Sequence, residues 1–130
     1  MCDAGKLFLG LDLSTQQLKA VLLSKDIRAP IYQTAIHFDK DLPGYGTTNG
    51  TIQGPGMGEV TSPVSMWLEA IDLLMNKMKT ADVNFGAIVA VCGAAQVSDA
   101  VADLIACYII RQATWFRLLV CSCGRIPLFP

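Results

Sequence analysis

The pattern of apolar and polar positions near the start of the chain predicts three short strands. Residues 6–12 and 18–24 are rich in leucine, and polar residues 14–17 separate them. Two such runs around a short polar turn are typical of a β-hairpin. After a second turn at 26–30, residues 31–38 alternate as a third strand would. The pattern therefore predicts an antiparallel three-strand meander.

The next segment, residues 39–59, has no such periodicity. It contains six glycines and two prolines in 21 residues. Glycine and proline interrupt regular structure, and a run this dense is typical of an extended loop. We therefore expect a long excursion without a regular element.

A helix and a further strand are predicted after this excursion. Residues 61–81 open with Thr61 and Ser62 as capping candidates and with Pro63 at a favoured first-turn position. Residues 86–95 then form a continuous apolar run, which is typical of a strand buried on both faces. The helix carries one apolar stripe at three- and four-residue spacing, formed by Val64, Trp67, Leu68, Ile71, Leu74, Met75 and Met78.

Length and charge narrow the class of protein. A chain of 130 residues has room for one domain, and its net charge of -1 with a pI near 5.6 argues against nucleic acid or anionic lipid as a partner. A small-molecule ligand fits better. Asp12 interrupts the first apolar run, and no signal-peptide pattern surrounds it. Charged residues also interrupt the later apolar stretch, so we expect no membrane span and a cytoplasmic location.

Metal chemistry based on cysteine and histidine is disfavoured. The chain has five cysteines, and without a secretion signal we expect reduced thiols. Cys121 and Cys123 form a C-x-C pair, but a structural zinc site needs four ligands and His37 is the one histidine. We expect His37 to lie on the surface or to be partly packed.

Asp12 is the first candidate functional residue. It looks buried at the end of the first strand and is followed by the polar turn Ser14, Thr15, Gln16 and Gln17. Turn amides and hydroxyls can donate to a polyphosphate, and one carboxylate can hold Mg²⁺ or its waters. The alternative is an ordinary turn in which Asp12 accepts backbone donors. No G-x-x-x-x-G-K-[ST] motif is present, so a P-loop is excluded.

The hairpin sequence LFLGLDLSTQQLKAVLL resembles the opening of the FGGY carbohydrate kinases, and most closely that of eukaryotic xylulokinases. These kinases share its D-x-S-T-Q-Q-x-K turn. Residues 37–47 (HFDKDLPGYGT), 60–79 (VTSPVSMWLEAIDLLMNKMK) and 83–96 (VNFGAIVAVCGAAQ) resemble the segments that follow, in the same order. The resemblance therefore covers about residues 6–96.

This resemblance implies an α/β fold, namely part of a ribonuclease H-like (actin-like ATPase) domain in a two-domain sugar kinase. It implies that Asp12, Ser14, Thr15 and Gln16 face the phosphates of ATP, with Asp12 binding Mg²⁺ through water. Gln96 matches a glutamine of the sugar-contact loop, although the rest of that loop is absent. The implied reaction is the phosphorylation of D-xylulose to D-xylulose 5-phosphate. The family's catalytic base would lie beyond this chain, so no catalytic residue is expected here.

The resemblance ends at Gln96, which divides the chain into residues 1–96 and an apolar tail, 97–130. Valine and serine at 97 and 98 are what codons beginning GT and AG would encode, as at the start of an intron. We therefore expect that the tail translates a retained intron or reflects an incorrect gene prediction. The alternative is a native tail with an amphipathic helix near 97–108 and an apolar strand within 115–123.

A chain that ends in this way leaves two functional interpretations. The first is a truncated, inactive fragment of a sugar kinase. The second is a non-catalytic binding or regulatory fragment that associates with a full-length kinase through an exposed sheet edge. In both, apolar surface around the strand at 86–95 would be uncovered, and we expect a marginally stable or aggregation-prone product.

Overall fold

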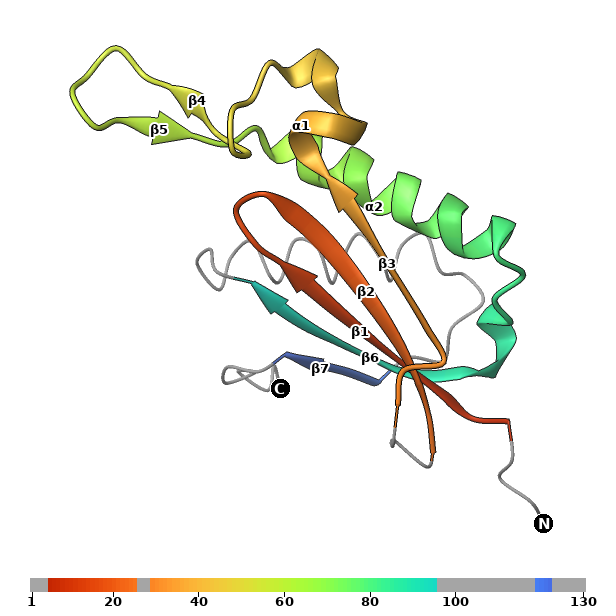
Figure 1. The fold of residues 1–130 in the computed structure, drawn as a ribbon. Helices are drawn as coiled ribbons and strands as arrows, with labels where there is room; N and C mark the ends of the chain where they lie inside the picture. The colour runs from red at the N-terminus through yellow and green to blue at the C-terminus, as the bar shows by residue number, and fades with distance from the viewer. Residues whose placement is uncertain (1–4, 26–28, 96–118, 123–130) are drawn as a thin grey trace.

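The computed structural model describes residues 5–25, 29–95 and 119–122. Its main feature is a five-stranded sheet with the strand order β3-β2-β1-β6-β7 (Figure 1). β1, β2 and β3 pair in antiparallel fashion, whereas β6 is parallel to β1 and β7 is parallel to β6. The strands are β1 (Leu7–Leu13), β2 (Gln17–Ser24), β3 (Tyr32–His37), β6 (Ile88–Ala95) and β7 (Leu119–Ser122). The chain is thus a mixed α/β structure, and the predicted meander is confirmed.

Strand alternation divides the sheet into two faces. Leu9, Leu11 and Leu13 of β1 are buried, whereas Asp12 between them is exposed. Leu18 and other buried residues of β2 continue the apolar face. Because the side-chain period of a strand is two residues, this register places all the buried leucines of β1 on one face of the sheet.

Helix α2 (Val64–Thr80) packs on this apolar face. Trp67, Ile71, Leu74 and Met78 are buried, as the apolar stripe predicted. Val64 was also placed in the stripe, but it is 43% exposed, since it begins the helix beyond the sheet-covered turns. The stripe omitted Met66 and Ala70, which are both fully buried. The buried face is therefore wider than a strict three- and four-residue spacing indicates.

The start of α2 differs from the prediction. Pro63 is the N-cap residue itself, and no side chain caps the helix. The Ser62 hydroxyl instead donates a hydrogen bond of 2.8 Å to the carbonyl of Gly50. The serine that looked like a cap therefore ties the helix entrance to the glycine-rich segment.

β6 is less buried than the apolar run predicted. Ile88 and Val91 are buried, but Val89 and Cys92 are exposed. α2 covers one face of the sheet, so apolar composition on both faces does not produce burial on both faces. A short 3-10 helix, η2 (Phe85–Ala87), precedes this strand.

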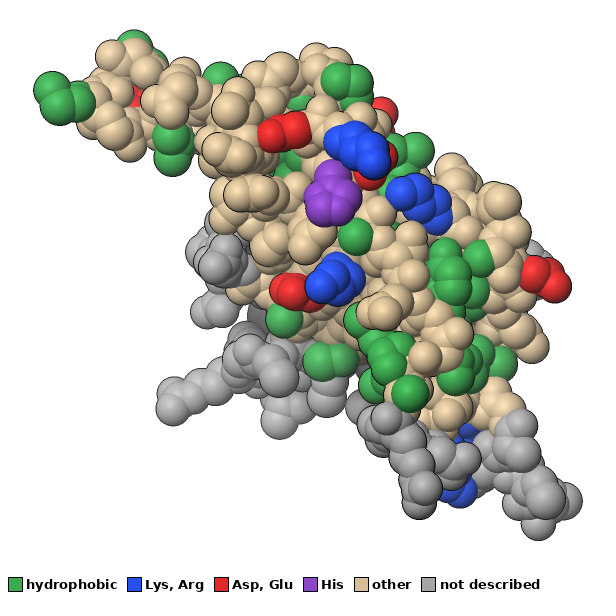
Figure 2. Space-filling model, in the orientation of Figure 1, with side chains coloured by type: hydrophobic (Ala, Val, Ile, Leu, Met, Phe, Trp, Pro, Cys, Tyr) green, Lys and Arg blue, Asp and Glu red, His purple; other side chains and the backbone are tan. Residues whose placement is uncertain are grey.

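The glycine-rich segment contains regular structure, so the prediction of a featureless excursion was wrong. Its elements are a short helix α1 (Phe38–Asp41), a 3-10 turn η1 (Pro43–Tyr45), and the paired strands β4 (Ile52–Gln53) and β5 (Val60–Thr61). Phe38, expected at the end of the third strand, starts α1 and is fully buried. β4 and β5 form an arm that projects from the rest of the structure, with hydrophobic side chains at its outer end (Figures 1 and 2).

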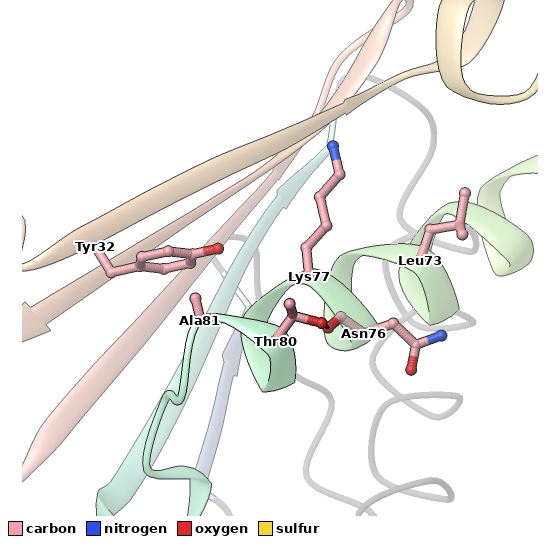
Figure 3. A pocket seen from close by; sticks show the side chains of 6 residues that line it. All are labelled: Tyr32, Leu73, Asn76, Lys77, Thr80 and Ala81. Carbon is pink, nitrogen blue, oxygen red and sulfur yellow. Dashed lines mark hydrogen bonds between the residues drawn. The ribbon is translucent and has the colours of Figure 1, made fainter.

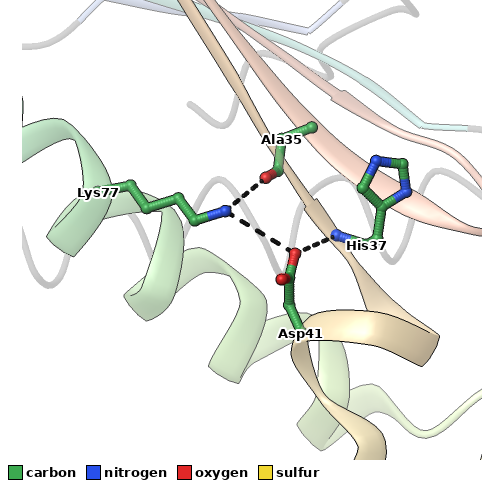
Figure 4. A network of polar contacts seen from close by, with 4 residues as sticks. All are labelled: Ala35, His37, Asp41 and Lys77. Atoms are coloured by element: carbon green, nitrogen blue, oxygen red, sulfur yellow. Dashed lines mark hydrogen bonds and ion pairs between the residues drawn. The ribbon is translucent and has the colours of Figure 1, made fainter.

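The two outer parts of the described sheet make different contacts. β6 pairs on its outer side with β7, which lies inside the strand predicted within residues 115–123. At β3, the Lys77 ammonium donates to the carbonyl of Ala35 at 3.0 Å and lies 3.8 Å from the Asp41 carboxylate. Asp41 in turn accepts the His37 amide at 2.8 Å (Figure 4). The helix predicted near 97–108 lies outside the described residues.

Candidate functional site

The polar turn between β1 and β2 is held by its own residues and by α1. The Ser14 amide and hydroxyl both donate to the carbonyl of Gln17, at 2.9 and 3.1 Å. The Phe38 amide donates to the carbonyl of Gln16 at 3.0 Å. Neither Thr15 nor Gln16 has a positive φ, so ordinary backbone conformations form this turn.

Asp12 lies beside this turn but is not buried, contrary to its appearance in the sequence. Asp12 lies on the opposite face of the sheet from the buried leucines of β1, because successive side chains of a strand point to opposite faces. Its cross-strand neighbours are Lys19 on β2 and Ala94 on β6. β1 and β6 are parallel, so Asp12 sits where their carboxyl ends meet, a common location for ligands in α/β proteins.

The turn offers a limited set of donors to a ligand. Gln16 is exposed, and its backbone amide has no backbone acceptor within the described residues. Ser14 is only half-buried, but its hydroxyl proton is directed to the Gln17 carbonyl. Thr15 is exposed and lies between these two residues. The structure thus brings Asp12, Ser14, Thr15 and Gln16 into one continuous stretch at one end of the sheet.

A set of hydrogen bonds around Asp39 supports the turn, and the sequence analysis did not identify this set. The Asp39 carboxylate accepts hydrogen bonds from the Thr47 hydroxyl (2.6 Å) and from the amides of Asn49 (2.6 Å) and Gly50 (3.0 Å). The Thr47 hydroxyl, followed by the Gly50 amide, holds the pKa of Asp39 below its ordinary value. Gly50 is buried against Thr15. The Asn49-Gly50 pair is a local sequence signal for the turn itself, but it does not identify Asp39 as the partner of that turn.

The remaining predicted residues lie elsewhere. Gln96 is outside the described residues, where it would follow β6 directly. His37 is exposed, as expected, and its backbone contacts Asp41. Among residues 5–25, 29–95 and 119–122, no three His, Cys, Asp or Glu side chains gather as a metal-ligand set. In the same residues, no helix combines the length and the apolar character that crossing a membrane would require.

A shallow groove of about 430 Å³ lies away from this turn, between β3 and the C-terminal half of α2 (Figure 3). Its lining is Tyr32, Leu73, Asn76, Lys77, Thr80 and Ala81. Lys77 is already engaged with Ala35 and Asp41 at the β3 edge. The groove brings together neither acids nor backbone donors comparable to those of the β1–β2 turn.

Comparison with known proteins identifies xylulose kinases among the relatives of this chain. The chain is 42% identical over 88 residues to "Xylulose kinase" of Mus musculus and 46% identical over 90 residues to "Xylulose kinase" of Schizosaccharomyces pombe. It is 41% identical over 91 residues to "Xylulose kinase 2" of Arabidopsis thaliana. These matches cover 68% to 69% of this chain but 16% of each relative, so the chain spans about a sixth of the curated relatives' length. No protein-family model matches the chain.

Proposed function

Because this chain is related to the xylulose kinases, as its resemblance to the FGGY carbohydrate kinases predicted, we propose that residues 1–96 are the N-terminal part of such a kinase domain with a ribonuclease H-like fold. The support is topological. Three antiparallel strands are followed by α2 and by β6, which returns parallel to β1. A helix that connects two parallel strands in one sheet is the usual unit of an α/β nucleotide-binding domain.

The proposed role of the β1–β2 turn is to hold the phosphates of ATP. Asp12 is an exposed carboxylate at the carboxyl ends of two parallel strands, and this position is the observation that carries the proposal. Mg²⁺ usually keeps several waters and takes one or two carboxylates, so Asp12 fits a water-mediated contact. The exposed Gln16 amide is a donor for phosphate oxygen, and Ser14 and Thr15 flank it. When bound, MgATP supplies the phosphoryl group, and Mg²⁺ neutralises its charge.

The proposed substrate of the complete enzyme is D-xylulose, and the product is D-xylulose 5-phosphate. Gln96 matches a glutamine of the family's sugar-contact loop, so it is the one residue of this chain proposed to contact sugar. No residue of this chain is assigned as the base that accepts the hydroxyl proton. We therefore expect the isolated chain to be inactive, with an affinity for MgATP weaker than about 1 mM.

Two measurements test this proposal. The first is an assay of phosphoryl transfer from ATP to D-xylulose by the 130-residue chain, in which measurable turnover would contradict the proposed inactivity. The second is an NMR titration with MgATP, in which we expect the amides of residues 12–17 to shift. Asp12→Asn should abolish the dependence of these shifts on Mg²⁺. Matched shifts with and without the carboxylate would exclude Asp12 from metal binding.

The alternative is a non-catalytic fragment that associates with an intact kinase through a sheet edge. In the described sheet β7 occupies the outer side of β6, so the two edge strands are β3 and β7. Lys77 and Asp41 already engage the outward backbone groups of Ala35 and His37. Edge lysines of this kind oppose strand addition at β3, so this edge is less suited to the alternative than that of β7. Co-purification with an intact homologue would support the alternative.

The proposed boundary at residue 96 has its own test. The relatives match 88 to 94 residues of the chain, which is consistent with a homologous part of the proposed length. We propose that residues 97–130 are a non-homologous tail of intronic or misassigned origin. Transcript sequencing decides this, since a coding exon joined after Gln96 in every messenger RNA would contradict an intronic origin. β7 lies within this tail, so a tail of either origin adds a strand to the sheet.

A further inference from the structure

We propose that Asp39 is a positioning residue for the phosphate-binding turn, acting through Gly50. Its carboxylate fixes the loop of residues 47–50, and this loop seats Gly50 against the carbonyl of Thr15. The inference rests on the proposed function, because it assigns to Asp39 the support of a turn that would bind the phosphates of ATP.

The first link is the set of hydrogen bonds around Asp39. One carboxylate oxygen accepts from the Thr47 hydroxyl and the Gly50 amide, and the other accepts from the Asn49 amide. Asn49 and Gly50 have φ values of 53° and 77°, and Thr48 and Thr51 pair across them. Two central residues with positive φ form a type I′-like turn, which brings both amides to one side. The carboxylate therefore stabilises a backbone shape that few sequences adopt.

The second link is the close approach of Gly50 to the turn. A Cβ atom on Gly50 would lie 1.8 Å from the Thr15 carbonyl oxygen and 3.1 Å from the Cα atom of Gln16. These neighbours are backbone atoms, which cannot rotate away as a side chain can. The carbonyl of Gly50 is also fixed, since it accepts the Ser62 hydroxyl at 2.8 Å. Gly50 is thus held between Ser62, which precedes α2, and the β1–β2 turn.

The third link is α1, which carries Asp39 and also contacts the turn. Phe38 is fully buried, and its amide donates to the carbonyl of Gln16. Asp39 is the next residue, so the side chain that fixes Gly50 starts from a backbone already bonded to the turn. The carbonyls of Thr15 and Gln16 are therefore contacted from two directions. This leaves the exposed Gln16 amide as the group presented to a ligand.

Loss of the Asp39 carboxylate should therefore loosen the turn without unfolding the domain. Asp39 is exposed and contributes nothing to the core beneath α2. A phosphate-binding loop acts through preorganised donors, so a loosened turn should bind phosphate less well. A purely structural role would lower stability and leave the binding per folded molecule unchanged.

The experiment compares Asp39→Asn with Asp41→Asn in the 130-residue chain. Asp41 lies on the same helix, but its printed contacts are with His37 and Lys77, away from the turn. We expect Asp39→Asn to shift the ¹⁵N–¹H signals of Thr15, Gln16 and Gly50 and to raise hydrogen exchange at Gly50 about tenfold. The dissociation constant for MgATP should rise at least about fivefold. Asp41→Asn should leave all of these values near those of the unmodified chain.

The outcomes separate the two proposals. If the unmodified chain binds no MgATP, the proposed function fails, and the signals of Thr15 and Gln16 still decide whether Asp39 positions the turn. If MgATP binds but Asp39→Asn behaves like Asp41→Asn, the positioning role is wrong. Should Asp39→Asn fail to fold, Thr47→Val removes one donor and keeps the carboxylate. A smaller shift at Thr15 and Gln16 in that variant supports the role, and unchanged signals contradict it.

Discussion

The glycine-rich segment contains two turns, each with a glycine of positive φ, that differ in surroundings. The first, at Asn49 and Gly50, is held by Asp39 and packs on Thr15. The second, between Gly54 and Glu59, closes the β4–β5 arm with a hydrogen bond of 2.7 Å between those two residues. Met57 at its end is completely exposed, at 107% of its reference area.

The difference shows that a glycine's importance is set by its neighbours as well as by its backbone angle. Gly50 and Gly58 have nearly the same φ, at 77° and 76°. A Cβ atom on Gly58 would meet nothing within 4 Å, whereas one on Gly50 would collide with the backbone of Thr15. The same substitution at the two positions therefore separates the cost of the backbone angle from the cost of the collision.

The largest effect is expected from Gly50→Ala. Gly58→Ala should cost about 1 kcal/mol, which is the penalty of a left-handed conformation for an L-residue. Gly50→Ala adds the displacement of the turn and should cost at least about 4 kcal/mol. Urea unfolding of the two variants measures the difference. Equal losses would show that Gly50 does not press on Thr15.

A smaller effect is expected from Ser62→Ala. This change removes the hydroxyl that donates to the Gly50 carbonyl at 2.8 Å. A net loss of about 1 kcal/mol in the free energy of unfolding is expected for such a bond. Thr61→Ala, at the neighbouring exposed position, is the control. A Ser62→Ala variant as stable as the control would mean that the helix entrance does not anchor Gly50.

Acidification should release the first turn by removing the charge of Asp39. Hydrogen bonding lowers the pKa of Asp39 from its ordinary value of 3.8. A carboxyl with a depressed pKa in the folded state contributes stability that is fully present above the ordinary value. That stability is lost as the pH falls through the lowered pKa. The amide signals of Asn49 and Gly50 should therefore move below about pH 4, and this movement should be absent from Asp39→Asn.

The smallest effect is expected at the end of the arm. Met57→Ser replaces a fully exposed side chain, so the free energy of unfolding should change by less than about 0.5 kcal/mol. Met66→Ser is the contrasting change, because the side chain of Met66, on α2, is fully buried. A large loss in Met57→Ser would reveal a contact of the arm that the described structure does not contain.

The main elements of the fold could be predicted because their signals are local. Strand alternation in β1–β3 and the stripe on α2 follow from burial on one face. The helix entrance could not be predicted in this way. Ser62 has the identity of a capping residue, but its partner Gly50 lies twelve positions earlier in the sequence. The small elements between 38 and 61 depend on similar long-range contacts, and composition alone indicated only a loop.

The candidate site shows the same limit. The residues Asp12 to Gln16 could be identified from their order and from the resemblance to a kinase family. The exposure of Asp12 could not be identified in this way, because the apolar run around it suggested an interior position, whereas strand alternation exposes it. Asp39 was missed because its role depends on Gly50 and Thr15, which come together only in the folded chain.

The ordinary backbone angles of Thr15 and Gln16 have a practical consequence for protein engineering. Because neither position demands glycine, either can accept most amino acids without a conformational penalty. Libraries randomised at these two sites would therefore sample side-chain chemistry alone. Their binding data would report ligand preference without a contribution from an unfavourable backbone angle.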